Sequence, residues 1–273
     1  MLPAERRKLI LEAVETHNSV SVADLCERLD VSEMTIRRDL RILSNEGLLQ
    51  RVHGGAIAKR SRSYEPPYML RASANLEAKQ AIGQAAAQLV QMGDSIALDV
   101  GTTTLEIAHQ LVGTRNLTVL TSSMPIANVL AEAPDIRLIL SGGIVRKQEQ
   151  SMTGQIAIET FRGFHVDKAF VGIGGIHLHA GLTEYNLEDA LVKQAILQCA
   201  AQVIVVADSS KLQRTCFAAV SPLTEMDVLI TDDGAPEDLL VTLSDLGIEI
   251  IVAPSQAHLT GHGGDEFQAT HLS

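Results

Sequence analysis

Cysteine is scarce in this chain and widely spaced. Cys26, Cys199 and Cys216 stand far apart, and none forms a Cys-x-x-Cys pair. That close spacing is typical of structural zinc sites and of redox dithiols. Its absence argues against both kinds of site, and we expect the three thiols to be reduced.

Long apolar runs are also lacking. Residues 202–207 form one of the longest, which is far shorter than the roughly 20 residues that a helix needs to cross a bilayer. The first residues, MLPAERRKLILEAV, place charges inside an apolar periodicity and carry no small-residue cleavage pattern, as in an amphipathic helix rather than a secretory signal. We therefore expect a cytoplasmic protein with no membrane partner.

Cofactor and metal motifs are incomplete. In Gly172-x-Gly174-x-x-His177 a histidine replaces the last glycine of the dinucleotide fingerprint, and no helix is expected directly after it. His177 and His179 share one side of an extended segment, but no third metal ligand stands nearby. We expect neither a cofactor nor a metal site.

The N-terminal part contains three helical patterns in close succession. Pro3 suits the first position of a helix that ends near Thr16. Ser21 can cap a second helix, with Asp24 three residues later where a capping-box partner would stand. Ser32 can cap a third.

The third helix has two different faces. At about 100° per residue, Leu40 and Leu43 fall within about 40° of Ile36 and form a core face. The opposite face is basic and polar: Met34, Arg37, Arg38, Arg41 and Asn45. Arginines on a helix often form only a solvated face, so the interpretation depends on what surrounds this helix.

A hairpin pattern follows the third helix directly. Residues 48–52 and 56–58 are expected to be strands joined by His53-Gly54-Gly55, since glycine tolerates the positive φ of tight turns. Three helices followed by such a wing predict a winged helix-turn-helix that binds DNA.

Charge is divided unevenly along the chain. Residues 1–62 hold 11 Lys and Arg against 9 Asp and Glu, leaving +2, whereas residues 63–273 hold 11 against 24, leaving −13. Because an acidic body repels DNA, binding must depend on the local arginine face.

The organisation beyond the hairpin is that of a second, larger domain. Residues 59–75 contain Pro66-Pro67 and scattered charge without periodicity, so we interpret them as a linker between a DNA-binding domain at 1–58 and a sensor domain at 76–253. The polar, glycine-rich residues 254–273 are expected to be a disordered tail.

Helical and strand patterns alternate in this larger domain. Helices are expected at residues 76–91, 105–111, 125–132, 155–161, 187–199 and 237–246, and strands at 95–100, 117–120, 136–140, 168–171, 203–207, 228–230 and 249–252. Apolar strands that alternate with helices predict an α/β fold with a mainly parallel sheet covered on both faces.

The residues after the strands are the candidate ligand site, because ligands bind at the carboxyl ends of strands in open α/β sheets. Asp99 follows the first strand, and Gly101-Thr102-Thr103-Thr104 then begins a helix, which favours a phosphate or carboxylate. A plain Thr-capped turn would have the same sequence.

Other strand ends are also rich in glycine and hydroxyl groups. They are Thr121, Ser122 and Ser123, then Ser141, Gly142 and Gly143, then Gly172, Gly174 and Gly175, and finally Asp208, Ser209, Ser210 and Lys211. We expect them to converge on one small ligand, with Lys211 as the balancing cation. Thr183 and Glu184 could accept hydrogen bonds from sugar hydroxyls, although a carboxylate at a helix start can also act on the helix dipole alone.

Several motifs occur in one order along the chain: SVSVADLCERLDVSEMTIRRDLRILSNEGLLQRVHGGA, DVGTTT, SGG, VGIGG, GLTEYNLEDALVKQA and ADSSK. With these motifs the chain resembles the DeoR family of bacterial transcriptional regulators up to about Ala253. The resemblance implies a sensor domain similar to ribose-5-phosphate isomerase and coenzyme A transferases. It also implies a repressor of a sugar-catabolism operon that a phosphorylated sugar controls.

The resemblance further implies roles for individual residues. Arg37, Arg38 and Arg41 would enter the major groove. Ser32 and Thr35 would contact phosphates at the start of the helix, and Arg51 and His53 would lie on the wing. Gly101–Thr104 would be the phosphate-binding loop, with Asp99 just before it and Lys211 across the cleft.

Two other hypotheses stay open at this point. One is a sugar-phosphate isomerase-like enzyme with an accessory DNA module, for which Asp99 and Glu184 are candidate carboxylates. The other is a protein-interaction module. For the regulator we expect a homodimer or tetramer, because one recognition helix covers few base pairs.

Overall fold

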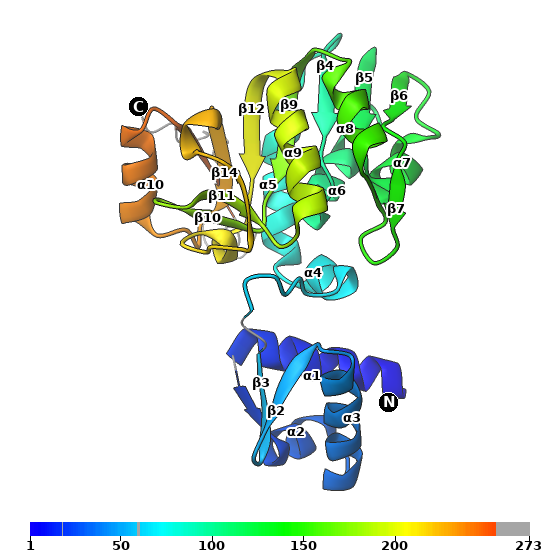
Figure 1. Cartoon of the computed structure of the whole chain (residues 1–273), viewed down its shortest axis with the longest axis vertical. Helices are drawn as coiled ribbons and strands as arrows, with labels where there is room; N and C mark the ends of the chain where they lie inside the picture. Colours follow the sequence, from blue (N-terminus) through cyan, green and yellow to red (C-terminus); the bar gives the residue numbers. More distant parts are fainter. Residues whose placement is uncertain (18, 59–60, 255–273) are drawn as a thin grey trace, which may run out of the picture. The chain divides into compact units, whose positions relative to one another are not determined.

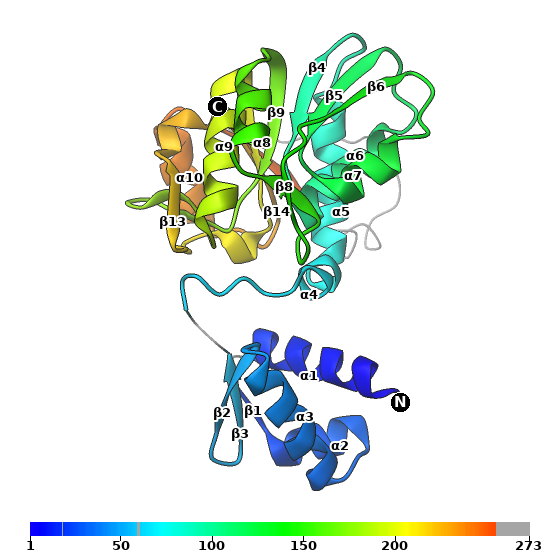
Figure 2. The same ribbon diagram turned by 45° about the vertical axis from the view of Figure 1, so that its right-hand side comes forward.

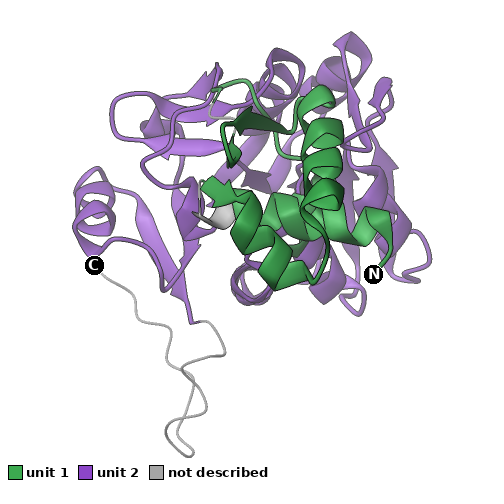
Figure 3. Cartoon of the chain, turned by 90° about the horizontal axis from the view of Figure 1, so that it is seen from below, with its two compact units in different colours: residues 1–74 green, residues 75–273 purple. Residues whose placement is uncertain are grey.

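The computed structural model describes residues 1–17, 19–58 and 61–254. The chain divides into two compact units, Met1–Ala74 and Asn75–Ser273, which Figure 3 shows in different colours. Except for Pro254, the expected tail at 254–273 lies outside the described residues. In the described part of the chain, no helix is both long and apolar enough to cross a membrane.

Unit 1 is a winged helix-turn-helix. Its elements are α1 (Pro3–His17), β1 (Ser19–Ser21), α2 (Val22–Leu29), α3 (Glu33–Asn45), β2 (Leu49–Val52), β3 (Gly55–Ala58) and α4 (Tyr68–Ser73). Ser21 caps α2 by accepting a hydrogen bond from the Asp24 amide, and Ser32 caps α3 by accepting one from the Thr35 amide. Ile36, Leu40 and Leu43 are at most 2% exposed, so the predicted core face of α3 is confirmed.

Strand β1 was not predicted, and it changes the reason for the glycine pair. The antiparallel sheet has the order β1-β3-β2. Gly54 has the positive φ expected of the turn, +82°. Gly55 does not; a Cβ there would lie 2.0 Å from the Val20 carbonyl oxygen, so glycine is needed for β1 to approach β3.

We expect Gly55→Ala to destabilise unit 1 by about 3 kcal/mol, the upper range for overpacking, because the clash is with backbone that cannot rotate away. Hydrogen exchange of the α3 amides in the full-length protein measures this opening. Gly54→Ala is the matched control. No described atom lies within 4 Å of its Cβ position, so it should cost only about 1 kcal/mol of left-handed strain. Equal losses in the two variants would contradict the packing explanation.

The segment interpreted as a linker includes ordered structure that packs within unit 1. The Tyr64 hydroxyl donates to the Leu48 carbonyl at 2.9 Å, and Leu70 of α4 is 7% exposed within the same apolar core. The Ser73 hydroxyl lies 3.1 Å from Glu12 Oε1 on α1. Helix α4 has only six residues after Pro67, too few to show a helical periodicity in the sequence.

Unit 2 is built on a parallel sheet, as the sequence predicted. The strand order is β15-β14-β12-β9-β4-β5-β6, and every described pairing is parallel. The strands are β4 (Ser95–Leu98), β5 (Leu117–Thr121), β6 (Ile136–Leu140), β9 (Val166–Gly172), β12 (Ala200–Val206), β14 (Val228–Asp232) and β15 (Glu249–Ala253).

Helices cover both faces of this sheet (Figures 1 and 2). Helices α5 (Leu76–Gln88), α6 (Thr102–Leu111) and α7 (Met124–Leu130) bury one apolar core, and α8 (Gln155–Arg162), α9 (Leu187–Cys199) and α10 (Glu237–Asp245) bury the other. Alternate residues of each strand enter the two cores, for example Ile96 one and Ala97 the other. This explains why the strands are apolar throughout.

Two small antiparallel sheets were not predicted. One has the order β10-β11-β13, formed by β10 (Gly175–His177), β11 (Gly181–Glu184) and β13 (Ala218–Ser221). The other pairs β7 (Ile144–Arg146) with β8 (Ser151–Thr153). Each of these strands has only three or four residues, which is too short for a period of two to be distinguished from a loop.

Candidate DNA-binding surface and ligand site

The outer face of α3 is exposed and basic. Met34 is 80% exposed, and Arg38 and Arg41 are also exposed. Arg37 donates to Glu33 Oε1 at 2.6 Å, one turn earlier on the same surface. An exposed pair of this kind contributes little stability, so the guanidinium can exchange this carboxylate for a phosphate or a base edge at small cost.

The start of α3 and the wing flank this face. The Ser32 hydroxyl lies 2.9 Å from the Thr35 hydroxyl and caps the helix. Arg51 on β2 and His53 in the turn after it are exposed. The eight residues expected at a DNA surface therefore lie on α3, at its N-cap or on the wing.

Asp39 was missed by the sequence analysis. It lies on α3 but is 3% exposed, and its carboxylate accepts from Arg6 Nε of α1 at 2.6 Å. At about 100° per residue it falls about 60° from Ile36, on the core side. A carboxylate at that position indicates a buried partner, and this ion pair joins α1 to α3.

The ligand-site residues of unit 2 gather at one edge of the sheet. Strands β12, β9, β4, β5 and β6 are consecutive neighbours in the parallel sheet, so their carboxyl ends share that edge. The polar residues after them are buried: Asp99, Thr102, Thr103, Thr104, Ser122, Ser123, Ser141 and Asp208 are each at most 8% exposed.

A buried ion cluster joins this edge to α9. The Lys193 ammonium donates hydrogen bonds to Asp99 Oδ2 and, at 2.8 Å, to the Gly172 carbonyl. It also lies 3.4 Å from Glu184 Oε2. The ammonium thus has two hydrogen-bond acceptors and a second carboxylate within ion-pair distance. With two carboxylates and one ammonium, the cluster carries a net charge of −1 when all three groups are ionised.

Burial and the cluster's charges shift the pKa values of its members. Burial raises the pKa of Asp99 to about 6, although the Lys193 ammonium opposes the shift. Burial alone would lower the pKa of Lys193, but the carboxylates of Asp99 and Glu184 raise it above its ordinary value. Lys193 therefore stays charged, and the raised pKa lets Asp99 take up a proton near pH 6.

Lys193, which the sequence did not single out, is the residue that pairs with Asp99. The role of Lys211 as the cation that balances a bound ligand stays a prediction. Lys211 ends the 3₁₀ turn η1 (Ser209–Lys211), and its ammonium lies 3.5 Å from the Tyr185 hydroxyl. Arg214, which was not predicted, stacks on the same tyrosine with its Cζ 5.2 Å from the ring centroid.

Thr183 and Glu184 lie on β11 and have protein partners. The Thr183 hydroxyl donates to the Gly175 carbonyl at 3.1 Å and accepts from the Cys216 amide at 2.9 Å. Glu184 Oε1 accepts from the Tyr185 amide at 2.8 Å. Glu184 is not at a helix start, so the dipole explanation for its charge is wrong.

Close packing explains several glycines of the strand ends. A Cβ at Gly174 would lie 2.8 Å from Glu184 Oε1, and one at Gly175 would lie 2.5 Å from the Arg214 carbonyl. Gly143 has φ +119°, and a Cβ there would lie 2.5 Å from the Thr153 carbonyl. Gly142 also has a positive φ, +70°. These residues shape the edge of the sheet.

The start of α6 offers backbone donors. Gly101 is the N-cap with φ 153°, and the first amides of a helix have no partner within it. The Thr104 hydroxyl donates to the Gly101 carbonyl at 3.1 Å, so it is used locally. Thr102 and Thr103 precede it, and both are buried.

Three buried oxygens near this edge make no hydrogen bond within the described part of the chain: Asp99 Oδ1, Ser122 Oγ and Ser151 Oγ. Ser151 was not predicted; it begins β8 and bridges to Ser123, which caps α7. Buried polar atoms are usually hydrogen-bonded. Three such oxygens without a partner at one edge are therefore typical of a site where a polar ligand supplies the missing hydrogen bonds.

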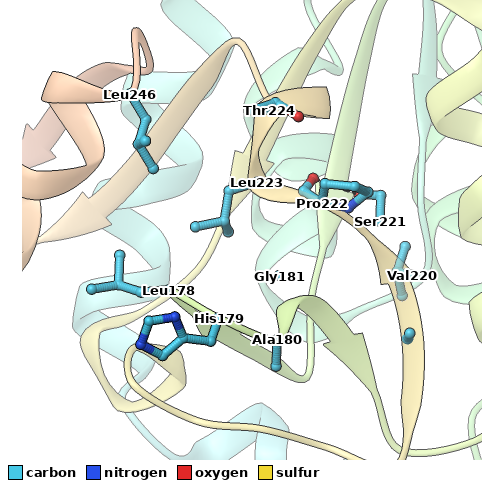
Figure 4. A pocket seen from close by; sticks show the side chains of 11 residues that line it. Leu178, His179, Ala180, Gly181, Val220, Ser221, Pro222, Leu223, Thr224 and Leu246 are labelled. Carbon is cyan, nitrogen blue, oxygen red and sulfur yellow. Dashed lines mark hydrogen bonds between the residues drawn. The ribbon is translucent and has the colours of Figure 1, made fainter.

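A separate hollow of about 560 Å³ lies elsewhere on unit 2 (Figure 4). Residues 178–181 and 219–224 line it, together with Leu246. It shares no lining residue with the strand ends described above, and it is not part of the candidate ligand site.

Two family models match the chain. Residues 6–62 match the family described as DeoR-like helix-turn-helix domain, and residues 74–233 match DeoR C terminal sensor domain. The chain belongs to the DeoR family.

Relatives of this DeoR-family protein match over almost their whole length. The HTH-type transcriptional repressor GlcR of Bacillus subtilis (strain 168) is 36% identical over 92% of the chain and 97% of its own length. The glycerol-3-phosphate regulon repressor of Escherichia coli (strain K12) is 32% identical over 92% and 99%. Both are named as repressors and neither as an enzyme.

Among solved structures, ribose 5-phosphate isomerase A from Methanocaldococcus jannaschii aligns with a TM-score of 0.38 and 18% identity. The alignment covers 51% of this chain and 55% of that one. The expected similarity to coenzyme A transferases stays a prediction.

Proposed function

We propose that this DeoR-family protein represses a carbohydrate-catabolism operon and that a phosphorylated sugar metabolite controls its binding to the operator. The observation that carries the proposal is the pairing of two features in one chain. One is an exposed arginine face on α3, and the other is a strand-end site with buried oxygens that have no hydrogen-bond partner among the described residues. Relatives named as repressors match over 92% of the chain.

The proposed DNA surface consists of α3, its N-cap and the wing. Arg37, Arg38 and Arg41 enter the major groove, where a guanidinium can donate two hydrogen bonds to guanine. The remaining contacts come from Ser32, Met34, Thr35, Arg51 and His53. Since unit 1 carries only a small positive charge, a few directed contacts must supply most of the affinity.

The proposed effector site lies at the carboxyl ends of the strands. The amides and hydroxyls at the start of α6 receive the phosphate, where the helix dipole favours an anion. Lys211 adds a positive charge, and Asp99 and Ser122 face the hydroxyl-bearing part. The proposed residues are Asp99, Gly101, Thr102, Thr103, Thr104, Ser122, Ser123, Gly142, Gly143, Gly174, Gly175, Thr183, Glu184 and Lys211.

Regulation requires that the effector bind one arrangement of the protein more tightly than the other. By linkage, an effector that weakens operator binding by some factor is itself bound more weakly by the DNA complex, by the same factor. We propose a homodimer or tetramer as the functional state, because paired recognition helices read two half-sites of an operator.

Two measurements on the full-length protein test this function. Thermal unfolding with a panel of glycerol 3-phosphate, ribose 5-phosphate, glucose 6-phosphate and their unphosphorylated parents should show a raised midpoint for at least one phosphate ester. Fluorescence anisotropy on a duplex selected by the protein from a random library should then show that this ester changes DNA affinity. Absence of both effects would reject the proposal.

An isomerase-like enzyme is the alternative that the buried carboxylates suggest, because the raised pKa of Asp99 lets it take up a proton near pH 6. The relatives named as repressors favour the regulator. A coupled assay for aldose–ketose interconversion separates the two functions. Robust turnover that is lost in both Asp99→Ala and Glu184→Ala would show that unit 2 is an enzyme and would reject the sensor hypothesis.

We expect Thr103→Ala to leave operator affinity unchanged. Its affinity for the effector should fall about tenfold or more, since a hydrogen bond to a charged group is worth about 1.5–3 kcal/mol. Lys211→Ala should act in the same direction. Titration of the active phosphate ester, followed by operator release, measures the loss. Thr114→Ala, just beyond the other end of α6, is the control that should respond normally. If Thr103→Ala instead unfolds unit 2, its hydroxyl is structural.

A further inference from the structure

Asn75 is the residue at which the chain enters the sensor unit. Unit 1 ends at Ala74 and unit 2 begins at Asn75, immediately before α5. Its backbone is left-handed, with φ 51°. Residues other than glycine rarely adopt this conformation, and asparagine tolerates it better than most.

The side chain of Asn75 does not cap the helix it precedes. It occupies the N-cap position of α5, but within the described residues it makes no cap hydrogen bond. Instead its amide donates to Asp208 Oδ1 at 3.0 Å, across 133 positions of sequence. Helix capping therefore does not explain this residue, whereas the bond to Asp208 does.

Asp208 is the first residue of the loop that ends in Lys211. It is 1% exposed, and the oxygen that accepts from Asn75 also accepts from the Ser210 amide at 3.1 Å and from the Ser210 hydroxyl. Burial opposes its charge, but the Lys211 ammonium and the bonds from Ser210 and Asn75 hold the pKa of Asp208 below its ordinary value. The Asp208 carboxylate thus connects residues 208–211, here called the effector loop, to Asn75, the first residue of unit 2.

We propose that Asn75 is a positioning residue that couples effector binding, through the contact of the effector with Lys211, to the DNA-binding unit. This inference rests on the proposed effector site. An anion held by Lys211 and the Ser210 hydroxyl competes with Asp208 for both groups, so the Asp208 carboxylate shifts. The Asn75 amide, which shares the same oxygen, then loses or changes its bond.

The consequence is conformational because the bond holds an unfavourable backbone. A left-handed backbone at a non-glycine residue is strained, and the surrounding contacts must offset this strain. When the contact to Asp208 weakens, the backbone at Asn75 is free to leave this conformation. The altered dihedral angle lies one residue after unit 1, whose last helix, α4, is packed into its core.

Asn75→Gly isolates the proposed bond, since glycine keeps the left-handed conformation and removes only the amide. Asn75→Asp keeps the size of the side chain but places a second carboxylate against Asp208. Asn116→Gly is the matched control, because Asn116 has φ 53° and is exposed at the other end of the α6 region. It has the same residue type and conformation without a bond to the effector loop.

The measured quantity is the coupling factor, the ratio of operator affinities without and with effector. The probes are the library-selected duplex and whichever of glycerol 3-phosphate, ribose 5-phosphate or glucose 6-phosphate gives the largest midpoint shift. We expect Asn75→Gly to bind DNA alone, and effector alone, within about threefold of wild type, whereas the added carboxylate of Asn75→Asp also repels an anionic effector. The coupling factor of both variants should fall at least about fivefold, the lower end of typical allosteric coupling, while Asn116→Gly keeps it.

The possible results distinguish failure of the coupling role of Asn75 from failure of the proposed effector site. A wild-type coupling factor in Asn75→Gly or in Asn75→Asp rejects the coupling role. Equal loss of coupling in Asn116→Gly also rejects it, since backbone freedom alone would then be responsible. If no phosphate ester binds wild-type protein, the proposed effector site fails, and this inference fails with it. Thermal midpoints separate either result from simple unfolding.

Discussion

Replacement of Lys193 by methionine is expected to destabilise unit 2 by about 3–5 kcal/mol, the range found when one partner of a buried ion pair is removed. The side chain is 3% exposed and contacts two carboxylates and a carbonyl. Methionine matches its length but leaves the Asp99 and Glu184 charges buried without a cation. Urea unfolding, followed by hydrogen exchange of the β4 and β9 amides, measures the loss.

The same variant should change the pH dependence of stability. In the wild type the pKa of Asp99 is raised from 3.8 to about 6. Its contribution is therefore most favourable below pH 3.8 and declines as pH rises through about 6. Without Lys193 the pKa of Asp99 rises further, so the decline extends to higher pH. The gap between wild type and Lys193→Met should widen from pH 5 to pH 8.

Two further variants test whether buried charge without a partner causes the loss of stability in Lys193→Met. Lys168→Met removes a lysine that lies 2.6 Å from Asp94, but both side chains are about 15% exposed. It should cost about 1 kcal/mol or less, because solvent screens a partly exposed pair. Adding Asp99→Asn to Lys193→Met should restore part of the lost stability by removing a buried charge. A gap that does not depend on pH would show that Lys193 acts mainly by packing.

The sequence predicted those parts of the fold whose physics is periodic and local. Ile36, Leu40 and Leu43 repeat at helical spacing, and the strands of the large sheet are apolar runs between helices. The carboxyl ends of parallel strands share one edge of the sheet, so the sequence could predict that the polar residues after five of these strands lie along the same edge. The small strands β1, β7, β8, β10, β11 and β13 were missed because each has only three or four residues.

Long-range pairs set the limit of prediction at the site. Lys193 lies on the buried side of its helix, which it shares with Ala190 and Ile196. A lysine there indicates a buried partner, yet nothing in the sequence says which carboxylate it meets 94 residues away. The Gly54-Gly55 pair shows the same limit. A turn requires only Gly54, and Gly55 is required by a strand that was not anticipated.

Arg38→Ala is expected to weaken operator binding by about 1–3 kcal/mol, about 5- to 150-fold, if its guanidinium contacts a base edge. Arg38 is exposed on α3. Arg37→Ala should fall in the same range or below it, because Arg37 must first leave Glu33, 2.6 Å away. Anisotropy titrations on the selected duplex measure both.

The salt dependence of binding separates the kinds of contact that these arginines make. Loss of a base contact relaxes specificity at one base pair, whereas loss of a phosphate contact weakens binding to all sequences and lowers the salt slope by about 1. Arg115→Ala, an exposed arginine of unit 2, has the same change in net charge and should leave affinity unchanged. Because the chain carries a net charge of −11, a general electrostatic attraction cannot replace a missing arginine. Unchanged affinity in both Arg37→Ala and Arg38→Ala would therefore remove α3 from the DNA interface.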